Sequence, residues 1–260
     1  MGTIALLTDY GLNDGFVGML KGAIKTVAPA TDIIDITHHI NSFDIRSAAF
    51  LLEKSYRYFP PATVFLVVVD PGVGTERRLL AAAAGGYTFV APDNGVLSSV
   101  LAQFDKKTVH SVGNEVLSPQ SVGATFHGRD IMAPIAAQLA QGTPLSGVGP
   151  MISSYAILPQ PSLLRNDRGV IGEIVYVDKF GNLISNITRR DLPSGVAPEH
   201  LRCTIGPARD IQFVASYAAA VDLAAIISGF DTVEIFVNQG SAAARFAKPV
   251  GMTLAVEAVA

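Results

Sequence analysis

The chain has 260 residues, of which 49% are hydrophobic and only 16% are charged. This length accommodates one or two domains, and the composition excludes both a disordered chain and a highly charged coiled coil. A net charge of −3 provides no basic field for nucleic acid, and no apolar run reaches the roughly 18 residues of a membrane-spanning helix.

The first half of the sequence alternates between short apolar strands and amphipathic helices. The continuously apolar, β-branched run at 63–69 predicts a central strand that is buried on both faces. Asp44 is a suitable N-cap for a helix, and Pro29 ends the helix before it. The remaining predicted strands cover 4–7, 32–36, 79–84 and 87–91, and the predicted helices cover 15–27, 44–57, 96–104 and 129–141. This alternation predicts a layered α/β/α domain over residues 1–160, with a largely parallel sheet.

The pattern changes near residue 158, where a connector rich in Pro, Asn and Gly begins. Short β-like runs follow it, and the helical signal is limited to residues 219–227. We therefore predict a second, mostly β domain over residues 169–260, either a barrel or a sandwich. Its predicted strands cover 170–177, 183–187, 200–205, 211–213, 232–237 and 252–259.

Two further features predict where the protein works and how it assembles. The single cysteine, Cys203, cannot form an intrachain disulfide, and no basic, signal-like segment follows Met1. We therefore expect a cytoplasmic protein. The low charge suggests apolar surface that partner subunits cover, and neither a nucleic-acid nor a membrane partner is expected.

Polar residues gather where the predicted parallel strands end, which is where ligands bind in α/β sheets. Asp9 and Asp14 follow the first strand, while Asp70 and then Arg77 follow the central strand. His127 precedes a predicted helix. An acid, a cation and a titratable base could thus meet at one edge of the sheet.

Plainer explanations exist for each of these residues. Asp9 and Asp14 could complement a helix dipole, residues 71–74 and 92–95 could be turns, and Asp178 to Asn182 could be a hairpin loop. His38 and His39 point to opposite strand faces, which argues against a metal pair. The sequence lacks the motifs GxxxxGK[ST], GxGxxG, GxSxG, HExxH and CxxC. A metal-dependent phosphohydrolase using Asp9, Asp14, Asp70 and His127 remains an alternative.

Five motifs, in this order, resemble one known family: TDYGLNDGFVG, VVVDPGVGTERR, APDNG, FHGRD and DKFGNLISNI. The family is that of the S-adenosylmethionine (SAM) hydroxide adenosyltransferases, which are related to fluorinase and chlorinase. The resemblance implies an α/β N-terminal domain, a C-terminal β-barrel and a homotrimer with sites at subunit interfaces. It also implies hydrolysis of SAM to adenosine and L-methionine. No cofactor or metal is implied, since SAM is the substrate.

The resemblance also implies a role for individual residues. Asp70, Arg77 and His127 match the catalytic set that orients and activates water. Asp9 matches the residue that accepts from both ribose hydroxyls, and Asp178 matches a contact to the methionine amino group. Asn182 matches an adenine contact, and Phe180 and Tyr217 match stacking positions. The other implied substrate-binding residues are Asp14, Phe43, Ser228, Val237 and Asn238.

Departures from the family pattern distinguish between related activities. Halogenating relatives have Tyr at the position of Asp70 and a halide-binding Ser at that of Gly128. They also have Ser-Arg where this chain has Gly229-Phe230. A carboxylate at position 70 would repel halide, so hydrolysis is preferred over halogenation. A non-catalytic module that binds adenosine or SAM is a third possibility, but it would not need the catalytic set.

Overall fold

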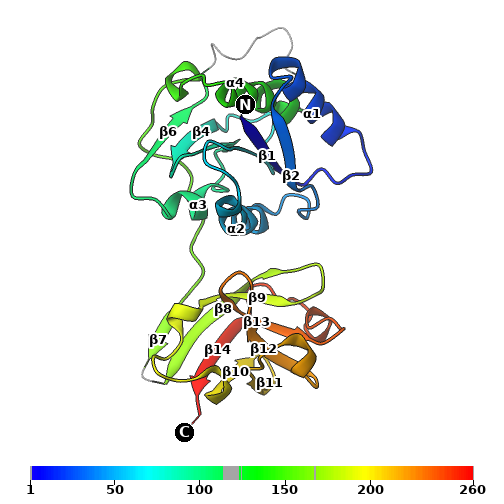
Figure 1. The fold of residues 1–260 in the computed structure, drawn as a ribbon, viewed down its shortest axis with the longest axis vertical. Helices are drawn as coiled ribbons and strands as arrows, with labels where there is room; N and C mark the ends of the chain where they lie inside the picture. Colours follow the sequence, from blue (N-terminus) through cyan, green and yellow to red (C-terminus); the bar gives the residue numbers. More distant parts are fainter. Residues whose placement is uncertain (1, 114–122, 124, 167, 260) are drawn as a thin grey trace. The chain divides into compact units, whose positions relative to one another are not determined.

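The computed structural model describes residues 2–113, 123, 125–166 and 168–259. The chain divides into two compact units, Met1–Leu158 and Pro159–Ala260. Each unit has its own sheet and its own hydrophobic core (Figure 1). None of the helices in the described ranges is both long enough and apolar enough to cross a membrane.

The first unit is built on a mixed, mostly parallel sheet with the strand order β2-β1-β3-β5-β4-β6. β2, β1, β3 and β5 run parallel to one another, whereas β4 is antiparallel to both β5 and β6. Every residue of β3 is buried, which confirms the predicted central strand. The bounds are β1 Thr3–Thr8, β2 Asp32–Thr37, β3 Val64–Val68, β4 Leu79–Ala84, β5 Tyr87–Pro92 and β6 Lys107–Ser111.

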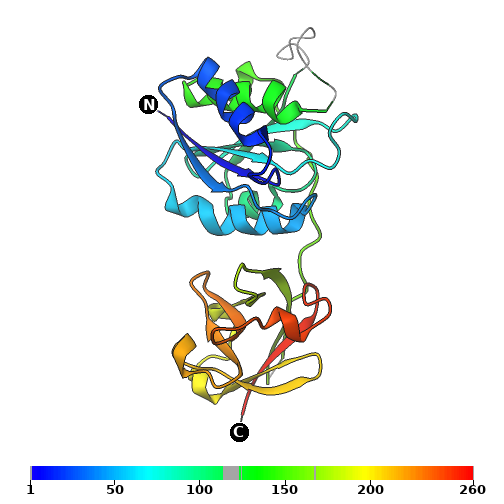
Figure 2. The same ribbon diagram turned by 90° about the vertical axis from the view of Figure 1, so that its right-hand side faces the viewer.

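Helices cover both faces of this sheet, as Figures 1 and 2 show. α1 (Phe16–Val27) and α4 (Ala133–Ala140) pack on one face, with α2 (Ile45–Ser55) and α3 (Ser98–Ala102) on the other. The α2 helix begins where expected, because Asp44 accepts a hydrogen bond from the Ser47 backbone N–H at 3.0 Å. The predicted α/β/α layering is therefore confirmed.

Two features of this unit differ from the sequence-based expectation. β6 was not expected, because its sequence KTVHS buries only Val109 and lies at the edge of the sheet. The predicted helix at 129–141 starts as a π-helical turn, η3 (Gly128–Met132), before it continues as α4. A π-helical turn widens the backbone locally and is frequent at functional sites.

The second unit is an antiparallel sheet with the strand order β11-β10-β14-β8-β9-β13-β12, and β7 pairs with β8. A bridge between Phe213 and Ala225 links its two edges, so the sheet is a nearly closed barrel around a core that includes Cys203. This confirms the barrel. The bounds are β7 Leu164–Asn166, β8 Gly169–Val177, β9 Leu183–Thr188, β10 Leu201–Ile205, β11 Ala208–Gln212, β12 Leu223–Ile227, β13 Thr232–Val237 and β14 Thr253–Ala258.

The predicted helix at 219–227 is wrong. Residues Leu223–Ile227 form β12, which pairs along its length with β13. The alanines of this segment favour a helix, but the pairing with β13 and the burial of Ala224 and Ala225 override that local preference. Among the described residues, the short 3₁₀ turns are η1 Tyr56–Tyr58, η4 Leu145–Gly147, η5 Arg189–Asp191, η6 Pro198–His200, η7 Tyr217–Ala219 and η8 Ala243–Arg245.

Candidate active site

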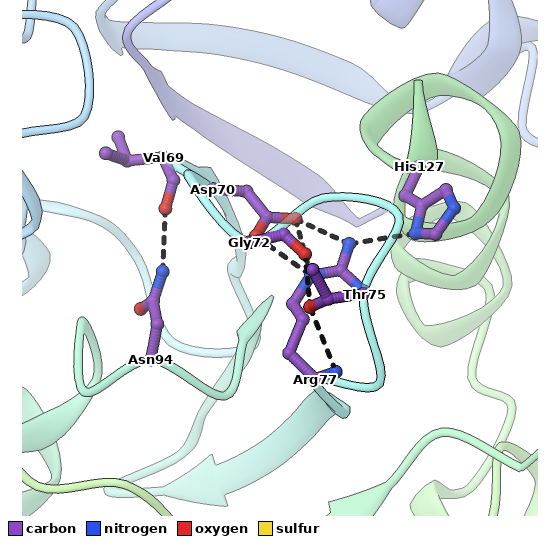
Figure 3. Close-up of polar contacts among 7 residues, drawn as sticks. All are labelled: Val69, Asp70, Gly72, Thr75, Arg77, Asn94 and His127. Carbon is purple, nitrogen blue, oxygen red and sulfur yellow. Dashed lines mark hydrogen bonds and ion pairs between the residues drawn. The ribbon is translucent and has the colours of Figure 1, made fainter. Parts of the chain in front are cut away.

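The carboxyl ends of β1, β3 and β5 meet at one edge of the first unit's sheet, because these strands are parallel neighbours. Asp9 follows β1 and Asp70 lies two residues beyond β3. Asn94 follows β5, and its Nδ2 donates to the Val69 carbonyl at 2.9 Å (Figure 3). This bond ties the loop after β5 to the end of β3, so the loops carrying these polar residues are held together.

The loop from β3 to β4 folds back on itself and returns Arg77 to Asp70. Thr75 donates from both its backbone N–H and its hydroxyl to the Gly72 carbonyl, at 3.1 and 2.7 Å. Gly74 has φ +79°, a conformation that residues with a side chain rarely adopt. The glycines of this motif therefore build a turn that positions an arginine.

Asp70, Arg77 and His127 form one continuous chain of hydrogen bonds (Figure 3). Arg77 Nε donates to both carboxylate oxygens of Asp70, at 2.8 and 2.9 Å, and Nη2 donates to Oδ2 at 2.6 Å. The same Nη2 lies 2.8 Å from Nδ1 of His127. The side chains of Asp70 and Arg77 are only 6% and 11% exposed, so solvent screens this ion pair weakly.

These contacts determine the protonation of His127. A guanidinium has only donors, so Nδ1 of His127 must accept, and its neutral ring then carries the proton on Nε2. Burial lowers the pKa of His127 below its usual 6.5, and the charge of Arg77 lowers it further, although Asp70 and Asp130 oppose the shift. His127 is therefore neutral at neutral pH.

The side chain of Asp9 is held in place by a hydrogen bond from the backbone of a neighbouring loop. Its Oδ2 accepts from the Phe43 N–H at 2.9 Å, and Phe43 has φ +70° with a 68% exposed side chain. Burial raises the pKa of Asp9, and two backbone hydrogen bonds partly offset that effect. The charge of Asp70 also raises it. Asp14, in contrast, is exposed in the turn before α1.

Tyr10 belongs to this site although the sequence did not single it out. A Cβ added to Gly128 would lie 2.2 Å from the Tyr10 hydroxyl oxygen and 2.9 Å from Val68 Cγ1. The Tyr10 ring packs against Phe16 and Phe126, with centroids 5.8 and 5.6 Å away. Burial and the charges of Asp9 and Asp70 raise its pKa well above 10, so its hydroxyl keeps its proton. The one available signal was its place inside the TDYG motif.

A cavity of about 400 Å³ adjoins the catalytic candidates in the first unit. Arg77 and His127 line it, together with Thr75, Ser111, Ile131 and Pro150. The Asp70–Arg77 ion pair is therefore largely buried, yet Arg77 and His127 both line an open cavity.

In the second unit, the loop between β8 and β9 is organised by Asp178. Its Oδ1 accepts from the backbone N–H groups of Phe180 and Asn182 at 2.9 and 2.8 Å, and its Oδ2 accepts from Asn182 Nδ2 at 2.9 Å. The amide oxygen of Asn182 is then the atom left to accept from a ligand. Phe180 is 72% exposed. Gly181 is required here, since its φ is +81° and a Cβ would lie 2.1 Å from Ser241 Oγ.

Tyr217 lies near this loop, because its hydroxyl bonds Glu234, which pairs with Ile184, two residues beyond Asn182. It donates to Glu234 Oε1 at 2.9 Å. Burial, this hydrogen bond and the nearby carboxylates raise the pKa of Tyr217 to about 12. Glu234 was missed from the sequence, because it sits inside an apolar strand-like run where no motif marks it.

The remaining predicted residues lie at two different ends of the β12–β13 hairpin. Val237 ends β13 and pairs with Leu223, and Asn238 follows it. This is the end that lies near Asn182, because Ile235 pairs with Leu183. Ser228 lies at the opposite end, in the turn, where its N–H donates to the Thr232 carbonyl at 2.8 Å. The structure thus gathers Asp178, Asn182 and Tyr217 but not Ser228.

The alternative of a metal site using Asp9, Asp14, Asp70 and His127 finds no support in this geometry. Both oxygens of Asp70 and the Nδ1 of His127 already bind the cationic Arg77, which competes for the same lone pairs. Among the residues that the structure describes, no three His, Cys, Asp or Glu side chains are grouped so that they could hold a metal ion.

The sequence is similar to protein families and to individual proteins that are already known. Two family models match: SAM hydroxide adenosyltransferase N-terminal domain over residues 4–149, and SAM hydroxide adenosyltransferase C-terminal domain over residues 172–255. A Salinispora tropica protein named (R)-S-adenosyl-L-methionine hydrolase is 44% identical over 184 residues, which are 69% of this chain and 70% of that protein.

Two further similarities extend the comparison. An Actinoplanes sp. protein named fluorinase is 32% identical over 218 residues, covering 73% of this chain and 72% of its own length. A crystal structure of an uncharacterized conserved protein from Thermotoga maritima superimposes with a TM-score of 0.90 at 35% identity, over 97% of this chain and 99% of that one. The similarity therefore spans both units.

Proposed function

Because the chain belongs to the SAM hydroxide adenosyltransferase family, we propose that it is an enzyme that hydrolyses S-adenosyl-L-methionine to adenosine and L-methionine. The observation that best supports this proposal is the hydrogen-bonded set of Asp70, Arg77 and His127 at the carboxyl edge of the sheet. A module that only binds its ligand does not need a buried acid fixed by two N–H groups of one arginine.

The difficult part of this reaction is activating water as the nucleophile. The oxygen of water forms a bond to C5′ of the ribose while the C5′–S bond breaks, and its electron pair leaves on sulfur as the neutral thioether of methionine. The leaving group needs no acid. Water has a pKa of about 15.7, so it needs a base and a position in line with the C5′–S bond, about 3–3.5 Å from C5′.

We assign the base to Asp70. His127 is neutral, its Nδ1 lone pair accepts from Arg77, and its Nε2 carries the proton, so this imidazole has no free basic site. Asp70 keeps a lone pair on Oδ1, which accepts only from Nε of Arg77, and there takes the proton that water loses as the C–O bond forms. Arg77 fixes the carboxylate and offers positive charge to the developing hydroxide. His127 holds Arg77 in place.

We assign substrate binding to residues of both units. Asp9 uses Oδ2 on the Phe43 N–H, which leaves Oδ1 for the ribose hydroxyls. Phe43 and Asp14 are assigned to the same binding set. Asp178 receives the methionine amino group, and Asn182 contacts adenine. Phe180 and Tyr217 supply stacking rings, and Ser228, Val237 and Asn238 complete the binding set.

The proposal includes a homotrimer in which neighbouring protomers share each site, without a cofactor, a nucleic-acid partner or a membrane partner. The low share of charged residues supports such covered surfaces. Cys203 is fully buried and unpaired, which supports a cytoplasmic location.

Two observations favour water over halide as the nucleophile. Asp70 would repel an anion at the position of attack. The space beside Gly128 is occupied by the Tyr10 hydroxyl, so a halide-binding side chain at position 128 has no room. The similarity to proteins named fluorinase therefore does not make halide the nucleophile of this protein.

The test is turnover of SAM in water enriched in ¹⁸O, with chromatography and mass detection of the products. We expect adenosine that carries ¹⁸O at the 5′ oxygen, together with methionine. Unlabelled adenosine would contradict attack by water at C5′. A chloride-dependent 5′-chloro-5′-deoxyadenosine would instead identify a halogenase, and absence of any product would identify a binding module.

A further inference from the structure

The outer face of β13 carries a carboxylate that the proposed reaction does not use. Side chains alternate along this strand. Val233, Ile235 and Val237 belong to the barrel core, whereas Glu234 and Phe236 project from the opposite face. Both outer residues are nevertheless buried, with Glu234 only 3% exposed. Something must therefore cover this outer face.

Tyr217 covers it. Its hydroxyl donates to Glu234 Oε1 at 2.9 Å, and its ring meets that of Phe236 edge to face, with centroids 4.7 Å apart at 83°. The ring is held at two points, yet the residue remains 46% exposed. A half-exposed aromatic ring whose plane is fixed is preorganised to stack on another flat ring.

Glu234 is energetically unfavourable at this buried position if its only role is to fill space on the outer face of the barrel. Burial raises the pKa of Glu234, and the charge of Asp178 raises it further, while the hydrogen bond from Tyr217 opposes the shift. A buried carboxylate beside a second carboxylate costs free energy that an apolar residue would not cost. Such costs are typical of groups held for binding or catalysis.

We propose that Glu234 is a positioning residue, which fixes the ring plane of Tyr217 so that the exposed part of that ring stacks on the adenine of the substrate. This inference rests on the proposed function, in which Tyr217 supplies a stacking ring for the substrate, and it assigns adenine as the group on which that ring stacks. Holding the ring in advance removes the entropy that an untethered side chain would lose on binding. Glu234 then acts on affinity and not on the chemical step.

The experiment compares Glu234→Gln, Glu234→Leu, Tyr217→Phe and the double variant Glu234→Leu/Tyr217→Phe, using full-length protein. Binding of adenosine is measured by calorimetry, and KM and kcat are measured with SAM. We expect Glu234→Leu and Tyr217→Phe each to raise the Kd for adenosine and the KM about three- to tenfold, with kcat nearly unchanged. Glu234→Gln keeps an acceptor oxygen and is expected within about twofold of wild type.

The double variant distinguishes a shared role from separate roles. If Glu234 works only through the Tyr217 hydroxyl, the double variant is no weaker than either single variant. Fold-changes that multiply would overturn the proposal, as would a Glu234→Gln defect as large as that of Glu234→Leu. Unchanged affinity in both single variants would also overturn it. Glu257→Leu, at an exposed position of β14, is the matched control and is expected to behave as wild type.

Two features keep the test decisive. Tyr217→Phe removes a single oxygen, so the comparison survives if Glu234→Leu fails to fold. The binding arm uses adenosine and does not depend on turnover. A wild-type protein that binds adenosine but does not cleave SAM would refute the proposed hydrolysis and leave the positioning role of Glu234 open to the same measurement.

Discussion

Nη2 of Arg77 lies 2.6 Å from Oδ2 of Asp70 and 2.8 Å from Nδ1 of His127, so a single guanidinium nitrogen joins the acid to the imidazole. The arginine is the central member of the set. It holds the carboxylate at two points, and it forces the imidazole to accept at Nδ1.

Replacing Arg77 with Ala should therefore lower kcat about 100- to 1000-fold, since it removes a preorganised donor and the group that orients Asp70. Arg77→Lys should recover little, because one ammonium cannot reproduce the two-point contact with the carboxylate. Arg78→Ala is the control. Arg78 pairs with Asp93, and its side chain is 41% exposed, so kcat should stay within a few-fold of wild type. Equal losses in the two variants would contradict a specific role for Arg77.

The pH profile should reflect the lowered pKa of His127. Protonation adds an N–H at Nδ1, which then faces the Arg77 guanidinium and breaks their hydrogen bond. Because the pKa lies below 6.5, activity should be constant with respect to this group at neutral pH and fall only below about 6.5. His127→Asn keeps an acceptor oxygen for Arg77 and does not titrate. Initial rates of both proteins across pH should show this acid limb in wild type and not in the variant.

Asp9 should set recognition of the ribose. Asp9→Asn replaces a charged acceptor by an amide, and we expect the Kd for adenosine to rise about tenfold or more. Wild type should prefer adenosine over 2′-deoxyadenosine, and the variant should lose most of that preference. Calorimetry with both nucleosides measures the two effects. Asp32→Asn, on the exposed β2 edge, serves as control, and a preference that persists in Asp9→Asn would remove Asp9 from ribose binding.

Gly128→Ala should destabilise the first unit by about 1–3 kcal/mol, because the new methyl group would overlap both the Tyr10 hydroxyl and Val68. Adding Tyr10→Phe should recover part of that loss by removing the nearer atom. The control is Gly18→Ala in α1, where a Cβ meets nothing within 4 Å. That change should stabilise the helix by about 0.5–1 kcal/mol. Urea unfolding of wild type and the three variants measures these differences, and a neutral Gly128→Ala would mean that Tyr10 moves freely.

Local patterns were sufficient for much of the fold. The uninterrupted apolar run of β3 and the N-cap at Asp44 depend on neighbours along the chain, so both could be predicted. β12 could not, because its alanine-rich sequence favours a helix, and only pairing with β13 makes it a strand. The edge strand β6 has a single buried residue and therefore carries almost no hydrophobic pattern.

The sequence by itself determined the family and the two structural classes, and it predicted the acid, the cation and the imidazole of the proposed catalytic set, because short motifs carry those residue types in a readable order. Only the tertiary structure decided how they are joined. Arg77 and His127 are 50 residues apart, and their bond sets the tautomer of the imidazole. Tyr10 against Gly128 and Glu234 beneath Tyr217 are likewise contacts across distant segments, which no local pattern encodes.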